Sequence, residues 1–218
     1  MHAFIDHARD FPGRIAAAGE EREAFGRLAE GQSPEALFIT CSDSRVIPSL
    51  FTGARPGRLF ELRTAGNAVP EYAEGASGEV ATIEYAVSVL RVPDIVVCGH
   101  SHCGAVRARV HGEDRGDVSP VLAGPRRPLA SVPAVAGRLE RQLPHLPVRD
   151  PESGIDDDAQ VAGHVQRHVK AQLDRLRQYP CVREGSAAGR LRLHGWYYAV
   201  DTGLVMEHDP AADAFLPL

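Results

Sequence analysis

Three short runs of apolar residues, at positions 36–40, 59–63 and 94–98, each have the length of one buried β-strand. Continuous apolar character over a few residues is typical of strands that are covered on both faces, as in a parallel sheet. Between the second and third runs, residues 78–90 carry apolar side chains at helical spacing. This order predicts a βαβ crossover, so we expect a sheet that is parallel at its centre.

Residues 1–31 have a different pattern. Apolar side chains recur at helical spacing in two pieces, which are separated by Pro12-Gly13 and Gly19. Because proline and glycine interrupt helices, we expect N-terminal helical arms in this region.

The middle of the chain combines irregular and helical segments. Residues 112–130 are rich in proline and glycine and predict a loop, which we expect to be followed by a helix near 131–143 and an acidic turn around 156–158. Valine and leucine then recur at three- and four-residue steps over residues 161–176. This spacing predicts a long amphipathic helix that Pro180 ends.

The C-terminal part predicts an antiparallel hairpin. Residues 190–200 alternate as a β-strand does, and Gly203 predicts a turn into a second strand at 205–208. The fold class that we expect is therefore α/β, with a central, mostly parallel β-sheet flanked by helices, N-terminal helical arms and a C-terminal antiparallel edge hairpin.

Composition and charge favour one domain and a small partner. With 218 residues, 44% of them hydrophobic, the chain has material for one sizeable core. We expect a single domain over residues 1–218, made of the arm at 1–31 and an α/β core at 32–218.

The formal net charge of -5 gives no reason to expect nucleic acid or a membrane surface as a partner. No stretch reaches transmembrane length, and Asp6 and Asp10 interrupt the N-terminal segment, so a cytoplasmic location is expected.

The four cysteines are few and widely spaced for this length. Such spacing argues against a disulfide framework and for metal binding or catalysis by some of the thiols. Cys98 lies inside an apolar run and Cys181 follows Pro180, so both are expected to pack in the core. Cys41 and Cys103 lie in a different context.

Cys41, His100 and Cys103 each follow closely on an apolar run. Ligands of open α/β sheets gather outside the carboxyl ends of the strands, so two distant loops are expected to converge there. Two thiolates and one imidazole are three ligands of the kind that zinc prefers, and a three-ligand set leaves one position for water. Taken singly, each residue would more often be an ordinary core residue; the three together favour a metal site.

Other chemistries fit the same residues less well. Asp43 and Arg45 stand two residues apart, which in an extended segment suits a charge-assisted pair. A cysteine phosphatase loop would need arginine where Ile47 stands, and a serine nucleophile elbow would need glycine at Cys103. The pair His164 and His168 has helical spacing without the glutamate of a metalloprotease, so a surface or packing role is expected.

Two segments carry a resemblance to a known family. The sequence C-S-D-S-R at 41–45 and the sequence G-H-S-x-C-G at 99–104 resemble the two signature segments of β-class carbonic anhydrases. The resemblance extends through residues 60–67, 83–87 and 194–197, and covers roughly residues 30–205.

The resemblance implies a set of roles. One Zn²⁺ per subunit would be bound by Cys41, His100 and Cys103, with Asp43 and Arg45 as the dyad that orients the zinc-bound water or hydroxide. The resemblance also implies substrate-binding residues: Gln32 matches the family glutamine that hydrogen-bonds the substrate, and Phe60 and Tyr85 match residues of a pocket that lies at a dimer interface in the plant-like branch. The arrangement in which Asp43 itself binds zinc as fourth ligand stays open. Since Phe38 stands where the bicarbonate-regulated branch has tryptophan, that regulatory site is not expected.

The implied activity is the reversible hydration of carbon dioxide to bicarbonate and a proton by attack of zinc-bound hydroxide, in a homo-oligomer that is a dimer or a tetramer. Two alternatives stay open at this point. One is hydrolysis of carbonyl sulfide or carbon disulfide on the same zinc site. The other is a non-catalytic zinc-binding protein on the same fold.

Overall fold

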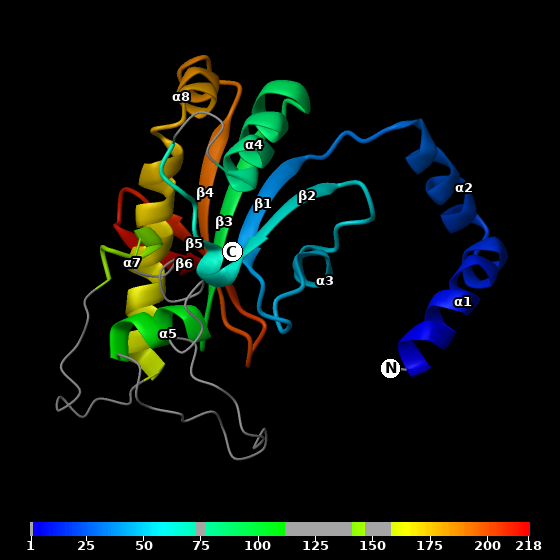
Figure 1. Ribbon diagram of the computed structural model, residues 1–218, viewed down its shortest axis with the longest axis horizontal. Helices are drawn as coiled ribbons and strands as arrows, with labels where there is room; N and C mark the ends of the chain where they lie inside the picture. The colour runs from blue at the N-terminus through cyan, green and yellow to red at the C-terminus, as the bar shows by residue number, and fades with distance from the viewer. Residues whose placement is uncertain (1, 73–76, 112–140, 147–157) are drawn as a thin grey trace.

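A computed structural model describes residues 2–72, 77–111, 141–146 and 158–218 of the chain. Its described part contains a six-stranded sheet in the order β2-β1-β3-β4-β5-β6 (Figure 1). The strands are β1 (Ala36–Cys41), β2 (Leu59–Thr64), β3 (Asp94–His100), β4 (Arg192–Tyr198), β5 (Val205–Asp209) and β6 (Ala214–Pro217). The first four strands in this order pair in parallel, and β4, β5 and β6 pair antiparallel. This confirms the expected α/β class, with a parallel centre and an antiparallel edge.

Alternate residues of the central strands build two different faces, as the pleat of a strand requires. Leu37 and Ile39 of β1 point into the main core, which also takes side chains from α4 (Gly78–Glu84) and α7 (Asp158–Leu176). Phe38, between them, faces the other side of the sheet and makes edge-to-face ring contacts with Phe51 at 6.0 Å and Trp196 at 5.8 Å. The two faces of the sheet are therefore both apolar at its centre.

The two faces are covered unequally. On the main-core face lie α4, the π-helical turn η3 (Tyr85–Val89), α7 and α8 (Pro180–Ala187), whereas the short helix α3 (Pro48–Thr52) packs on the other face. Helix α5 (Gly104–His111) contacts α7 at the end of the sheet where β3 finishes. This end of the sheet is the one on which the predicted ligands converge.

The arm consists of α1 (His2–Ala17), α2 (Glu20–Arg27) and the turn η1 (Leu28–Glu30). It stands away from the sheet in Figure 1, and α1 has no buried residue. The expected break at Pro12-Gly13 is wrong, because α1 continues through Pro12 and the chain turns only near Gly19. An exposed helix tolerates one proline because water replaces the backbone hydrogen bond that proline removes.

Several expected boundaries differ from the structure. The strands β1 and β3 run to Cys41 and His100, so these residues end their strands instead of following them. The long helix ends at Leu176, so the expectation that Pro180 ends it is wrong. Pro180 instead begins α8, because proline fits the first turn of a helix. Neither α3 nor β6 is foreseen by the hydrophobic pattern.

Some of the expected segments lie outside the described residues. These are the loop at 112–130, most of the helix near 131–143, and residues 156–157 of the acidic turn. In the ranges that are described, no helix is long and apolar enough to cross a membrane.

Candidate metal centre

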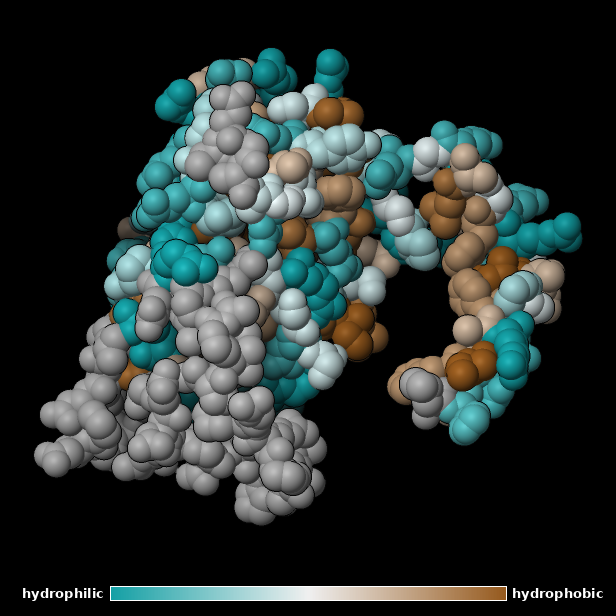
Figure 2. All heavy atoms as spheres, viewed as in Figure 1, coloured by the Kyte–Doolittle hydropathy of each residue, from teal (hydrophilic) through white to brown (hydrophobic). Residues whose placement is uncertain are grey.

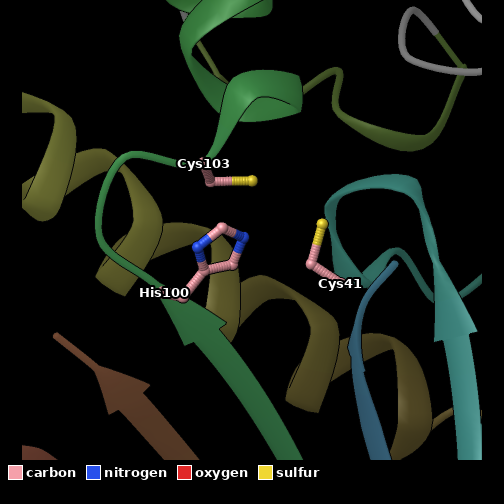
Figure 3. Close-up of side chains that lie close together, drawn as sticks. All are labelled: Cys41, His100 and Cys103. Atoms are coloured by element: carbon pink, nitrogen blue, oxygen red, sulfur yellow. The ribbon is translucent and has the colours of Figure 1, made fainter. Parts of the chain in front are cut away.

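The side chains of Cys41, His100 and Cys103 converge on one point (Figure 3). One ligand atom from each residue lies within 4.8 Å of the corresponding atoms of the other two, and all three residues are buried. The parallel pairing of β1 with β3 brings the carboxyl ends of these strands to the same edge of the sheet, and Cys103 follows at the start of α5. The convergence expected from sequence is confirmed.

The close packing of α7 against β3 fixes the position of His100. Gly99 precedes it, and a Cβ atom on Gly99 would lie 2.5 Å from Cγ1 of Val165 and 2.8 Å from Cγ2 of Val169. Both valines belong to α7. Only glycine allows the helix to come this near, so the end of β3 is held against a rigid neighbour.

The ring of His100 is oriented for a metal ion. Its Nδ1 atom lies 2.8 Å from the carbonyl oxygen of Ser101, which can only accept, so Nδ1 carries the proton. The Nε2 atom then has a free lone pair, and it is buried with no hydrogen-bond partner among the described residues. An unpaired buried polar atom is costly, whereas a backbone carbonyl behind a histidine is the usual support of a metal ligand. The donor set and this orphaned atom fit a zinc ion.

The two thiols influence each other strongly. A hydrogen bond from Cys103 is the largest cause that lowers the pKa of Cys41, to about 4, and the backbone N–H of Gly66 also donates to the Cys41 sulfur at 3.4 Å. The same hydrogen bond, together with burial, raises the pKa of Cys103 well above its ordinary value. Ionisation of both thiols at once therefore needs a cation beside them. A divalent metal ion supplies that charge.

Asp43 and Arg45 form the pair that their spacing predicts. Arg45 donates from Nε to Oδ1 of Asp43 at 2.9 Å and from Nη2 to Oδ2 at 2.7 Å. This contact lowers the pKa of Asp43 to about 2, so the carboxylate is ionised at neutral pH. Its Oδ2 atom lies 4.0 Å from Nε2 of His100, next to the metal cluster.

Arg63 is a residue whose role sequence reasoning missed. From β2 it donates to the carbonyl oxygens of Cys41 at 2.9 Å, Asp43 at 3.0 Å and Val46 at 2.6 Å. These bonds hold the loop that carries both the first cysteine and the aspartate. The only available signal was its position inside the matching segment at 60–67, which does not reveal the contacts.

The expected substrate-binding residues do not join the cluster within one chain. Gln32 is exposed and precedes β1, so it lies at the opposite end of that strand from Cys41. The rings of Phe60 and Tyr85 lie 5.9 Å apart. Phe60 stands four residues before Thr64, the partner of Cys41 across the sheet, which is roughly 13 Å along a strand.

The remaining cysteines and histidines pack as expected. Cys98 is completely buried, which raises its pKa to about 12, and Cys181 packs at the edge of the main core. His168 is fully buried, whereas His164, one turn earlier on α7, contacts Arg167. His168 thus occupies a packed position and His164 a position beside an arginine, and neither belongs to the three-residue cluster.

Comparisons with known proteins point to one family. The family model described as carbonic anhydrase matches residues 36–205. Over 196 residues the chain is 41% identical to a carbonic anhydrase of Pseudomonas aeruginosa, covering 90% of this chain and 83% of that protein. It is 40% identical over 199 residues to carbonic anhydrase 1 of Escherichia coli O157:H7, covering 91% and 84% of the two chains.

Solved structures agree with the sequence comparisons. The β-carbonic anhydrase CcaA superposes with a TM-score of 0.81 at 32% identity, covering 100% of this chain and 99% of that one. A structure from Sordaria macrospora, described as one of two tetrameric β-carbonic anhydrases, gives a TM-score of 0.68 at 29% identity and covers 94% and 95% of the two chains.

Proposed function

The chain belongs to the β-class carbonic anhydrase family, and from that premise we propose that it catalyses the reversible hydration of carbon dioxide to bicarbonate and a proton. The observation that carries the proposal is the unpartnered Nε2 atom of buried His100, which faces the sulfur atoms of two cysteines. Beside it stands the ionised carboxylate of Asp43, with Oδ2 4.0 Å from Nε2 of His100.

We assign one Zn²⁺ per subunit to Cys41, His100 and Cys103. Thiolate and imidazole ligands suit zinc, and three protein ligands leave one coordination position open. When bound, zinc supplies Lewis acidity, which lowers the pKa of a water molecule in that position and makes it nucleophilic.

Asp43 and Arg45 act as the catalytic dyad in this proposal. An ionised carboxylate can only accept hydrogen bonds. Asp43 therefore accepts a hydrogen bond from an O–H of the attacking water and so orients it. Arg45 donates one hydrogen bond to each carboxylate oxygen and thereby keeps Asp43 charged and fixes the orientation of its carboxylate. Asp43 is bonded in this way rather than displaced toward the cysteines, which favours the dyad over its use as a fourth ligand.

Gln32, Phe60 and Tyr85 are proposed to bind the substrate in a homo-oligomer, at least a dimer. A single chain keeps them apart from its own metal cluster, so a second copy is needed to bring such residues to the site. Exposed apolar side chains support this: Phe4 is 80% exposed on the arm, and Leu50 and Val89 are 75% and 61% exposed on the body. Figure 2 shows hydrophobic residues along the arm and on the body that it faces. A surface on which apolar side chains gather, as they do along the arm, is typical of contacts between proteins.

The proposal extends to the organisation of the chain. We propose that residues 1–31 serve as an arm for assembly and that residues 32–218 form the zinc-binding core. The structure of the Sordaria macrospora relative is described as tetrameric, which supports assembly beyond a single chain. A cytoplasmic location suits the four cysteines, since all of them are free thiols.

Stopped-flow measurement of carbon dioxide hydration, with the zinc content determined on the same sample, tests the proposed function. We expect stoichiometric zinc and rapid hydration. Zinc without hydration would overturn the enzymatic role and leave a zinc-binding protein. Faster turnover of carbonyl sulfide or carbon disulfide than of carbon dioxide would change the assigned substrate to that sulfur compound.

A further inference from the structure

His168 lies behind the metal centre, on the helix that packs against β3. It is fully buried in α7, and its Nε2 atom lies 2.7 Å from the carbonyl oxygen of Gly66. A carbonyl oxygen only accepts, so Nε2 carries the proton of the ring. The Nδ1 atom must then accept.

The groups around Nδ1 agree with that tautomer. Gln172 accepts from the backbone N–H of Val69 through Oε1 at 2.8 Å, which leaves its amide nitrogen to donate to Nδ1 of His168 at 3.2 Å. The ring of His145 stacks on that of His168, and its Nε2 atom lies 2.9 Å from the same Nδ1. Burial lowers the pKa of His168 to about 3, so the ring is neutral at physiological pH. His168 is therefore fixed as a donor to Gly66.

Gly66 connects this donor to the metal site. It belongs to the turn η2 (Ala65–Asn67), has a φ of 72°, and a Cβ atom on it would lie 3.1 Å from Cβ of Ala105. Its carbonyl accepts from His168, and its own N–H donates to the sulfur of Cys41 at 3.4 Å. One residue thus receives a bond from the helix and gives one to a metal ligand.

We propose that His168 is a positioning residue that holds Gly66 so that its N–H donates to the Cys41 sulfur and tunes that sulfur as a metal ligand. A hydrogen bond to a thiolate withdraws electron density from the sulfur, so the ligand donates less charge to the metal and the metal keeps more of its Lewis acidity. Groups behind a ligand adjust metal sites in this way. The inference rests on the proposed function only in that the cluster binds a metal ion.

Cobalt substitution in the full-length chain tests the proposal through a spectroscopic signature. Co²⁺ bound by thiolates has a sulfur-to-metal charge-transfer band, whose energy reports how strongly the sulfur is hydrogen-bonded. His168→Phe keeps an aromatic ring, slightly larger than imidazole, and removes both nitrogens, so the band is expected to move to longer wavelength. Metal affinity, measured by competition with a chromophoric chelator, is expected to fall by about tenfold, because the Gly66 turn no longer holds the Cys41 sulfur in place for the metal.

Two matched variants separate positioning from packing. His168→Gln places an amide donor near the position of Nε2 and is expected to restore both the band and the affinity. His164→Phe makes the same replacement one turn earlier on α7, where the ring contacts Arg167, and should change neither. A folded His168→Phe protein with an unchanged band and unchanged affinity would overturn the proposal.

A measurement on the unmutated chain keeps the proposal testable if His168→Phe does not fold. In protein loaded with ¹¹³Cd, a scalar coupling between the metal and the Gly66 amide proton reports the N–H···S bond, and ¹⁵N shifts report which nitrogen of His168 is protonated. Absence of the coupling, or a proton on Nδ1, would contradict the inference. Failure to bind Co²⁺ or ¹¹³Cd at all would instead count against the proposed function.

Discussion

Arg45 binds the carboxylate of Asp43 through two nitrogen atoms at once, Nε to Oδ1 at 2.9 Å and Nη2 to Oδ2 at 2.7 Å. Arg45 also donates to the carbonyl oxygen of His102 at 3.0 Å, so the pair is tied to the segment between two of the predicted metal ligands. The charge of Asp43 and its direction are therefore set by the same contacts.

Asp43→Ala is expected to keep zinc and lose turnover. None of the three predicted ligands is changed, but the attacking water loses its hydrogen-bond acceptor, and a positioned acid or base is typically worth about 10²- to 10⁴-fold in rate. Stopped-flow hydration and metal analysis of one preparation check this result. Full activity in this variant would refute the dyad.

Asp94 offers a matched control for that experiment. It also receives two bonds from one arginine, with Nε and Nη2 of Arg192 each 2.7 Å from a carboxylate oxygen. Asp94 begins β3, whereas His100 ends it, so this pair lies at the other end of the strand from the metal centre. Asp94→Ala should therefore keep most of the turnover.

Cys41→Ala is expected to abolish stoichiometric zinc binding, because two protein ligands remain where three are needed. Cys98→Ala removes a thiol that is also buried but packs on the other face of the sheet with Phe38 and Val96. Zinc content after dialysis should fall only in the first variant. Retention of one zinc per chain by Cys41→Ala would remove this cysteine from the ligand set.

Arg63→Met should loosen the loop that carries Cys41 and Asp43. Three carbonyl oxygens lose a charged donor, and we expect the free energy of unfolding to fall by about 1–3 kcal/mol. Urea denaturation with and without added zinc measures the change. An unchanged unfolding midpoint would show that water replaces the guanidinium at no cost.

The pH dependence of stability should contain a contribution from His194. Burial alone would lower its pKa, but hydrogen bonds to Glu207 at 2.6 Å and Asp94 at 2.9 Å outweigh burial and raise it. A raised pKa means that the folded state favours the protonated ring. The stabilisation is complete below the unfolded value of 6.5 and is lost as pH rises through the folded value.

Denaturation of the unmutated chain and of His194→Gln, compared at about pH 6 and 8, isolates this contribution. The charged groups that face the ring are Asp94 on β3 and Glu207 on β5, and Arg192 on β4 pairs with Asp94. The stability difference between the two proteins should shrink as pH rises. A difference that grows with pH would contradict the assigned direction.

Local patterns predicted the parts of this structure that depend on neighbouring residues. The continuous apolar runs indicated β1, β2 and β3, and the parallel order of these strands was enough to bring Cys41 and His100 to one edge. The limits of prediction are also physical. The helix α3 is too short to show a periodic pattern. Proline usually interrupts a helix, but the solvent-exposed helix α1 continues through Pro12.

Support behind the metal centre could not be predicted for a different reason. Gly66 and His168 lie far apart in the chain and meet only because α7 packs against β3 beside Gly99. On the sequence, His168 is one more polar position of an amphipathic helix. Its hydrogen bond to Gly66 exists only after the tertiary fold has formed.

The places of Cys41 at the end of β1 and His100 at the end of β3 have a consequence for the lifetime of the protein. An ion held by both residues would act as a reversible cross-link between strands that are separated along the chain by β2 and α4. Such a link restricts the unfolded chain and draws the folding equilibrium toward the native state by mass action. Metal starvation would then lower the stability of the protein as well as its activity, because chains without the cross-link would unfold more often and be exposed to proteases.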